Sequence, residues 1–290
     1  GQILSLYMMI NYLGSGLGQF MITVADPARF QLFVIASIVF SAALLPILLT
    51  TASAPRPTSP KRMNFKDLYK ISPLAIIGTL CAGMLGSSIN GMGPVFASDS
   101  GLPVVGVSTF MASVIIGGMV LQFPVGRLSD SFDRRTILAL VAFLTVLAAL
   151  GVIWAVGKPP IWLFVAGAIF GGFAFTIYPL CASQINDLAD PDSLVQVSAG
   201  LLLAYGVGAS IGPILASQMM GQFGPEGMFV SNAVLVGSLA LFTVYRMIRR
   251  DRSDKSQITF MPLGGMGVSS KQLYASTLKS LLRQHKKTQK

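Results

Sequence analysis

The chain has 290 residues, of which 53% are hydrophobic and only 11% charged, and its mean hydropathy is +0.69. Soluble domains carry about 25% charged residues, so this composition excludes an ordinary soluble protein and indicates a membrane protein. The formal net charge is +10, but the bases gather in short segments between apolar runs, which suits a membrane surface better than a nucleic acid.

Eight apolar stretches are each long enough to cross a bilayer as a helix, which needs about 20 residues. A charged residue at the centre of a membrane helix costs about 2.5–3.5 kcal/mol, and only Arg246 lies within any stretch. The sequence therefore predicts an all-α integral membrane protein with eight transmembrane helices, over residues 3–23, 30–51, 73–97, 104–125, 136–156, 161–183, 195–220 and 227–248.

The residues between the second and third stretches predict a division of the chain. Residues 52–72 hold three prolines and five bases, a composition typical of a linker. Residues 1–51 then form two helices of one bundle, residues 73–248 form a six-helix bundle, and residues 249–290 form a basic tail. Leucines among the bases of this tail predict either a disordered segment or a short amphipathic helix on the anionic inner leaflet.

The distribution of bases predicts the orientation. Nineteen of the 21 bases lie in residues 52–72, 126–135 and 246–290, whereas the alternate connections hold only Arg29 and Lys158. The positive-inside rule places base-rich connections in the cytoplasm. We therefore expect a multi-pass protein of the cell inner (plasma) membrane with both ends of the chain in the cytoplasm.

Five charged side chains lie within residues 126–135, between two apolar stretches. Asp130 and Arg134 are four residues apart, a spacing that pairs them on a helical turn. Pro124 stands just before the segment and predicts that the preceding helix ends there, since proline removes a helical hydrogen bond. We expect a short charged joint at the membrane surface.

Read in full, the segment GRLSDSFDRRTIL resembles the signature loop of the major facilitator superfamily. The pattern of that loop is glycine, any residue, leucine, a small residue, aspartate, a base, an aromatic residue, glycine and two bases. Ser131 replaces a base and Asp133 a glycine, and the matching residues are Gly126, Leu128, Ser129, Asp130, Phe132, Arg134 and Arg135. In that superfamily the loop joins helices 2 and 3, with a pseudo-symmetric copy between helices 8 and 9. The segments LYMMINYLGSGLGQF, QFPVGRLSD, GFAFTIYPL and LLLAYGVGASIGP are similar to its YcaD-like branch.

The resemblance numbers the helices after the linker as 7 to 12, so the chain covers helices 5 to 12 and is expected to be incomplete at its N-terminus. It implies a secondary active transporter of a small solute that works by alternating access. The signature loop is then a gate made of Gly126, Asp130, Arg134 and Arg135, with the Asp130 carboxylate held by the positive N-terminal end of helix 5, near residues 2–5. The alternative is that the loop only anchors the topology.

Substrates of such transporters bind near the bilayer midplane, often where glycine or proline interrupts a helix. The predicted hinge residues are Gly91, Gly93, Pro94, Gly208, Gly212 and Pro213. Helices 5, 7, 10 and 11 line the cavity in the family, so the predicted substrate-binding residues are Asn11, Tyr12, Asn90, Tyr178 and Tyr205. The alternative for each is a hydrogen bond between helices.

The sequence contains no catalytic triad, metal-ligand cluster or phosphate-binding loop, so we expect no enzyme, no metal and no cofactor. A proton-coupling carboxylate would have to lie in helices 1 to 4, because the spans themselves hold none. The alternative functions are a lipid or hydrophobic-drug flippase of the same fold, favoured by a methionine-rich interior, and a transporter-like receptor or scaffold. We expect a monomer that contacts a small-molecule substrate and membrane lipids, and no nucleic acid.

Overall fold

The computed structural model describes residues 10, 13–25, 30–49, 65–189 and 193–249, and this part of the chain contains helices and no strand. The all-α prediction is confirmed for these residues. The elements are η1 (Gln19–Thr23), α2 (Gln31–Leu48), α3 (Phe65–Ile71), α4 (Pro73–Asp99), α5 (Val104–Ser131), α6 (Arg134–Ala155), α7 (Pro160–Ala174), α8 (Ile177–Leu188), α9 (Leu194–Phe223) and α10 (Gly227–Arg249).

Six helical segments are long and apolar enough to cross a membrane, namely α4, α5, α6, α7 with α8, α9 and α10. They coincide with the six stretches predicted after the linker. α2 is a shorter apolar helix, and the stretch predicted over residues 3–23 lies partly outside the described residues. Six of the predicted spans are therefore confirmed, whereas the count of eight is not.

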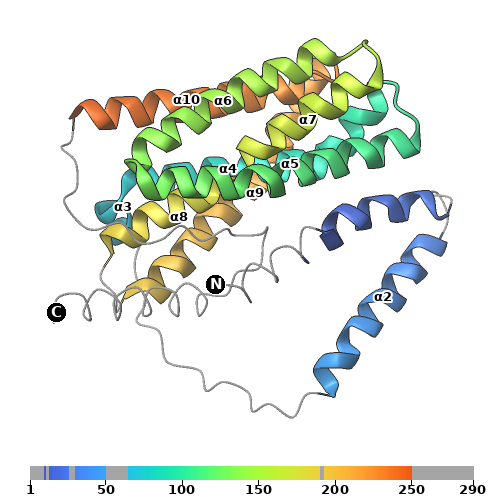
Figure 1. The fold of residues 1–290 in the computed structure, drawn as a ribbon, viewed down its shortest axis with the longest axis horizontal. Helices are drawn as coiled ribbons and strands as arrows, with labels where there is room; N and C mark the ends of the chain where they lie inside the picture. Colours follow the sequence, from blue (N-terminus) through green and yellow to red (C-terminus); the bar gives the residue numbers. More distant parts are fainter. Residues whose placement is uncertain (1–9, 11–12, 26–29, 50–64, 190–192, 250–290) are drawn as a thin grey trace.

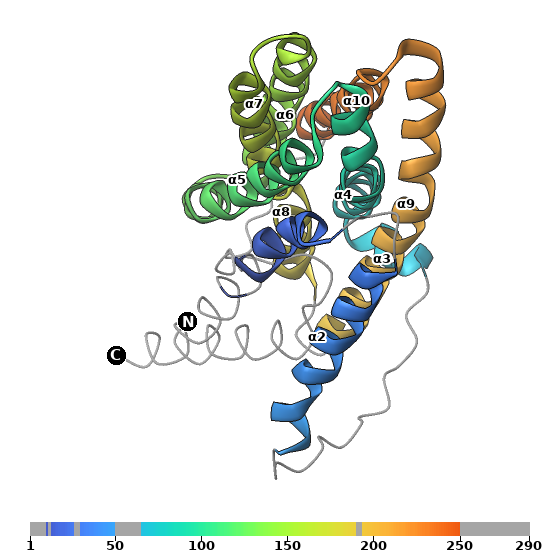
Figure 2. The same ribbon diagram turned by 90° about the vertical axis from the view of Figure 1, so that its right-hand side faces the viewer.

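The helices from α4 to α10 form one bundle (Figures 1 and 2), in which α4 lies against α9, α5 against α7, and α6 against α10. Ring contacts between buried phenylalanines connect α10 with α4 and α7. The ring of Phe229 meets Phe96 at 4.7 Å and Phe170 at 5.0 Å between centroids, both edge-on. Because lipid is as apolar as the side chains, such close packing holds membrane helices together in place of the hydrophobic effect.

α4 and α9 approach so closely that their contact requires glycine. A Cβ on Gly212 would overlap the carbonyl oxygen of Met84, and one on Gly208 would overlap that of Leu80. Small residues at such contacts let the backbones of membrane helices touch. These two predicted hinge residues therefore have a packing role, and their use as hinges stays a prediction.

The other predicted hinge residues lie in the same continuous helices. A Cβ on Gly91 would lie 3.6 Å from the ring of Pro213, and one on Gly93 would lie 2.8 Å from the sulfur of Met111. Pro94 and Pro213 are inside α4 and α9, which continue on both sides of them. Their bending in a transport cycle also stays a prediction.

α5 ends later than the sequence predicts. It continues through Pro124 and Gly126 to Ser131, so the predicted end near Pro124 is wrong. Membrane helices tolerate proline where neighbouring groups satisfy the freed carbonyl oxygen. The signature segment therefore consists of the last six residues of α5, a two-residue connection and the first five residues of α6.

The span predicted over residues 161–183 consists of two helices. α7 ends at Ala174 and α8 begins at Ile177, and between them the Thr176 hydroxyl donates to the Phe173 carbonyl at 2.7 Å. α8 is thus a separate element of 12 residues. It carries a predicted substrate residue near its start and an aspartate near its end.

The short helix α3 lies within the predicted linker, most of which is outside the described residues. Its Leu68 is buried beside Gly200 of α9, where a Cβ would overlap the leucine side chain. The end of the linker is therefore fixed against the bundle.

The bundle has two distinct ends. In Figure 1 the α5–α6 connection and the end of α10 lie on the left, whereas the α6–α7 and α9–α10 connections lie on the right. Arg127, Arg134, Arg135 and Arg249 therefore lie at the left end, named here the charged end, and Lys158 lies at the other. This alternation agrees with the predicted topology, and which end faces the cytoplasm stays a prediction.

Candidate functional site

Two of the tyrosines predicted to bind substrate are in direct contact inside the bundle. Tyr178 near the start of α8 and Tyr205 on α9 have ring centroids 5.3 Å apart and planes at 73°. This edge-to-face arrangement is one that aromatic pairs prefer. Both rings are half-buried, so each keeps a surface that a ligand can reach.

The hydroxyl of Tyr205 fills a notch in α4. A Cβ on Gly86 would lie 2.7 Å from that oxygen, and a Cβ on Gly83 would overlap the Tyr205 backbone. Asn90, one turn further along α4, donates its Nδ2 to the Gly86 carbonyl at 2.9 Å. Asn90 thus bonds within its own helix, one turn from the glycine that the Tyr205 hydroxyl faces, so three of the five predicted residues lie in one region of the bundle.

We name Asn90, Tyr178 and Tyr205 the tyrosine site. Within the described part of the chain neither hydroxyl has a hydrogen-bond partner, and Asn90 uses only its Nδ2. The other two predicted residues, Asn11 and Tyr12, lie outside the described residues.

The chemistry of the tyrosine site is polar and aromatic without charge. α4, α8 and α9 supply two phenols and an amide, and no Asp, Glu, Lys or Arg lies within residues 73–97, 161–183 or 195–220. Burying an ionised solute without a counter-charge is costly. The arrangement suits an uncharged solute that offers hydrogen-bonding groups and a face for aromatic contact.

At the charged end, Arg134 is buried in an ion-pair cluster, with only 3% of its surface exposed. Its Nε donates to Asp187 Oδ2 at 2.5 Å, its Nη1 to Ser129 Oγ at 3.0 Å and its Nη2 to Asp130 Oδ1 at 3.3 Å. The predicted pairing of Asp130 with Arg134 is confirmed. We name these four residues the arginine cluster.

The arginine cluster joins three helices, because Ser129 and Asp130 lie in the last turn of α5, Arg134 begins α6 and Asp187 lies in the last turn of α8. A planar guanidinium suits this task, since its donors spread in a fixed fork toward several acceptors. Sequence reasoning did not assign Asp187 to the cluster. The sequence offered one indication of its role: Asp187 is an acid next to a connection that holds no bases. Its partner Arg134, however, is 53 residues away in the sequence.

The two departures from the family pattern have local roles. The Asp133 carboxylate accepts the backbone N–H of Arg135 at 2.9 Å and so caps the start of α6. The Ser131 hydroxyl donates to the Arg127 carbonyl at 3.1 Å at the end of α5. The Asp133 cap satisfies a backbone N–H that the start of a helix leaves open, whereas the Ser131 bond is an ordinary bond to the carbonyl four residues earlier.

The four residues of the predicted gate all lie within the described part of the chain. Gly126 is buried on α5, Arg135 is half-buried, and the Asp130 side chain is 29% exposed while held by Arg134. Residues 2–5, the predicted partner of that carboxylate, lie outside the described residues. The latch between the two bundles therefore stays a prediction.

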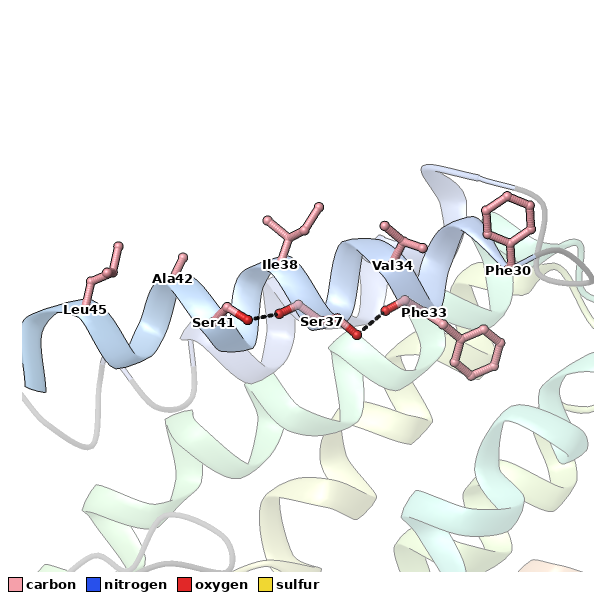
Figure 3. A pocket seen from close by; sticks show the side chains of 8 residues that line it. All are labelled: Phe30, Phe33, Val34, Ser37, Ile38, Ser41, Ala42 and Leu45. Carbon is pink, nitrogen blue, oxygen red and sulfur yellow. Dashed lines mark hydrogen bonds between the residues drawn. The ribbon is translucent and has the colours of Figure 1, made fainter. Parts of the chain in front are cut away.

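A hollow on α2 differs in character from the tyrosine site. Figure 3 shows Phe30, Val34, Ile38, Ala42 and Leu45 along one side of the helix. The hydroxyls of Ser37 and Ser41 donate to carbonyl oxygens four residues earlier in the same helix, at 2.9 and 2.8 Å. The two serine hydroxyls of the hollow are therefore already bonded within α2, and its other lining side chains are apolar.

The described residues contain no group of three or more His, Cys, Asp or Glu side chains that could hold a metal ion. Cys81 and Cys181 are both buried as free thiols in the bundle.

The sequence profile of the Major Facilitator Superfamily matches residues 1–200 and again residues 75–286. The chain belongs to the major facilitator superfamily. Within it, the chain is 25% identical over 260 residues to the "Uncharacterized MFS-type transporter YcaD" of Escherichia fergusonii, an alignment that covers 89% of this chain. It is 27% identical over 262 residues, or 90% of its length, to an "Uncharacterized MFS-type transporter" of Yersinia pestis.

The alignments cover 66% of the length of each of these relatives. They confirm the resemblance to the YcaD-like branch that the sequence segments indicate. The names of these relatives describe MFS-type transporters. The numbering of α4 as helix 7, which would place the arginine cluster at the joint of helices 8 and 9, stays a prediction.

Proposed function

We propose that this superfamily member is a secondary active transporter that moves a small, uncharged solute by alternating access, and that the tyrosine site is the part of its substrate site contributed by helices 7, 10 and 11. The supporting observation is the contact of Tyr178 on α8 with Tyr205 on α9, whose hydroxyl faces Gly86 of α4, the residue to whose carbonyl Asn90 donates. Substrates of such transporters bind between helices near the bilayer midplane.

In this mechanism the arginine cluster keeps the charged ends of α5, α6 and α8 together as one body. It also fixes the Asp130 carboxylate where the other bundle would meet it. Loss of that contact would open the cytoplasmic side. Asp130→Asn removes the charge and is expected to change both the transport rate and the balance of inward-open and outward-open states; unchanged values for both would reject the gate and leave the topology anchor.

The substrate site is tested by ligand-induced thermal stabilisation of the purified protein against a library of small solutes, because a bound ligand raises the unfolding temperature. A stabilising solute is expected to bind about tenfold more weakly to Tyr205→Phe, since one hydrogen bond contributes about 0.5–1.5 kcal/mol. Tyr245→Phe, a phenol on α10 beside Arg249, is the matched control. Equal losses in both variants would reject the site.

A second variant tests the notch. Gly86→Ala places a methyl group against the Tyr205 hydroxyl and should weaken solute binding by displacing the phenol. Gly206→Ala on α9 is the control, because a Cβ there meets no atom within 4 Å. Equal affinity in all three proteins would show that the phenol position is irrelevant to the ligand.

Different experiments distinguish the proposed transporter from the two alternative functions. A flippase would move a fluorescent phospholipid between leaflets in liposomes, whereas a solute transporter would not. A receptor would lose its output when residues 250–290 are deleted, whereas a transporter would keep its flux. We propose an inner-membrane monomer without a cofactor; proton coupling is tested by a pH gradient across the liposome, which would drive solute accumulation only in a coupled transporter.

A further inference from the structure

The end of the bundle opposite the arginine cluster carries a compact group of exposed side chains. Trp154 at the end of α6 and Trp162 at the start of α7 have ring centroids 5.9 Å apart and planes at 84°. The Lys158 Nζ lies 2.9 Å from the centroid of the Trp154 ring. The tryptophans are 58% and 51% exposed, so neither is part of the buried core. We name these three residues the tryptophan corner.

The connection between α6 and α7 holds this corner in a fixed shape. Gly157 has φ 75°, a left-handed conformation that favours glycine. The backbone N–H of Lys158 donates to the Ala155 carbonyl at 3.2 Å, and that of Trp162 to the Pro159 carbonyl at 3.0 Å. The lysine therefore stands on a tight turn between two helix ends and not on a long loop.

Two apolar stripes lead from the bundle to the corner. On α6 the exposed side chains recur every three or four residues, which places them on one face, and they are Leu140, Phe143, Leu147, Leu150 and Trp154. On α7 the exposed stripe is Trp162, Val165 and Ile169. α6 and α7 are neighbours in Figures 1 and 2, so the stripes form adjoining surfaces that end in the two indoles.

The charge of Lys158 is not neutralised by the described part of the protein, in which it forms a cation–π contact and no ion pair. An ammonium has three N–H donors, and a contact with a ring face leaves donors for an anion. Indoles prefer the headgroup level of a bilayer, and lysine extends to that level from a helix end. Phosphate is the anion available there.

We propose that the tryptophan corner is a binding site for one phospholipid of the adjacent leaflet, which is the external leaflet by the distribution of bases. The phosphate binds Lys158, the indoles of Trp154 and Trp162 lie beside the glycerol ester region, and the acyl chains follow the stripes on α6 and α7. The site is independent of the proposed transport function and requires only that the bundle is embedded in a bilayer.

Trp154 and Trp162 are the two tryptophans of the chain, so the tryptophan fluorescence of the protein comes from this corner alone and can report lipid binding there. The purified protein in detergent micelles is titrated with phosphatidylglycerol that has brominated acyl chains, which quench indole fluorescence on contact. Brominated diacylglycerol, with the same chains and no phosphate, is titrated in parallel. The measured quantity is the lipid mole fraction at half-maximal quenching.

Saturable quenching by phosphatidylglycerol at a lower mole fraction than by diacylglycerol is expected. Lys158→Gln should raise the half-saturation point about fivefold, which corresponds to about 1 kcal/mol for one lysine at a membrane surface. Lys158→Arg should keep tight binding. Arg249→Gln removes a cation beside an aromatic ring at the other end of the bundle and should change nothing. Equal quenching by both lipids, or no effect of Lys158→Gln, would overturn the proposal.

Discussion

The two ends of the bundle use cations in opposite ways. Arg134 is buried at the charged end, where it donates to groups on two other helices. Lys158 at the tryptophan corner rests on one exposed ring within a single helix pair. Removing one partner of a buried ion pair leaves an uncompensated charge, whereas an exposed cation keeps its hydration. The first contact therefore holds the helices together, and the second is available to the membrane.

The largest expected loss of stability comes from removing the buried cation, Arg134. Arg134→Ala should lower the free energy of unfolding by about 3–5 kcal/mol, because the largely buried Asp187 carboxylate would lose the guanidinium that donates to it. Unfolding can be followed with a thiol-reactive dye, since Cys81 and Cys181 are both buried. A double variant, Arg134→Met with Asp187→Leu, should recover much of this stability, because it removes both charges. If the double variant lost as much free energy of unfolding as Arg134→Ala, the loss would not have an ionic cause.

A smaller loss is expected from neutralising one acid of the arginine cluster. Asp187→Asn keeps the shape of the side chain but removes its charge, and hydrogen bonds to charged groups contribute about 1.5–3 kcal/mol. Asp130→Asn should cost less, because that side chain is more exposed than Asp187. A reversed order in dye-detected unfolding would show that Asp130, and not Asp187, is the main partner of Arg134.

The cap of α6 should contribute less again. Asp133→Ala removes the acceptor for the Arg135 N–H and should cost about 1 kcal/mol, whereas Asp133→Asn should cost little, because asparagine caps helices about as well. The same unfolding assay compares the two variants. Equal losses would mean that the charge of Asp133, and not its hydrogen bond, stabilises the joint.

The smallest effect is expected at the tryptophan corner. Lys158→Gln should change the free energy of unfolding in detergent by about 0.5 kcal/mol or less, as is usual for exposed cations. The lipid titration should nevertheless respond to this variant. A loss comparable with that of Arg134→Ala would remove the contrast between the two ends.

Sequence reasoning found the pair of Asp130 and Arg134 because a spacing of four is a local property of a helix. It did not assign Asp187 to Arg134, since no local rule connects residues 53 apart. It predicted Asn90, Tyr178 and Tyr205 from polarity and helix number, and the structure places them together. It treated Asp133 as a departure from the family pattern, whereas the structure shows a helix cap.

The positions of the six spans after the linker and the class of fold were determined by the sequence itself, because an apolar run of about 20 residues has few stable structures other than a membrane helix. The tertiary structure decided which side chains meet. Close contact of α4 with α9 places the Tyr205 hydroxyl in the notch at Gly86, and the separate helix α8 brings Asp187 to Arg134. Such contacts depend on the distances between helices, which composition and spacing along one helix do not contain.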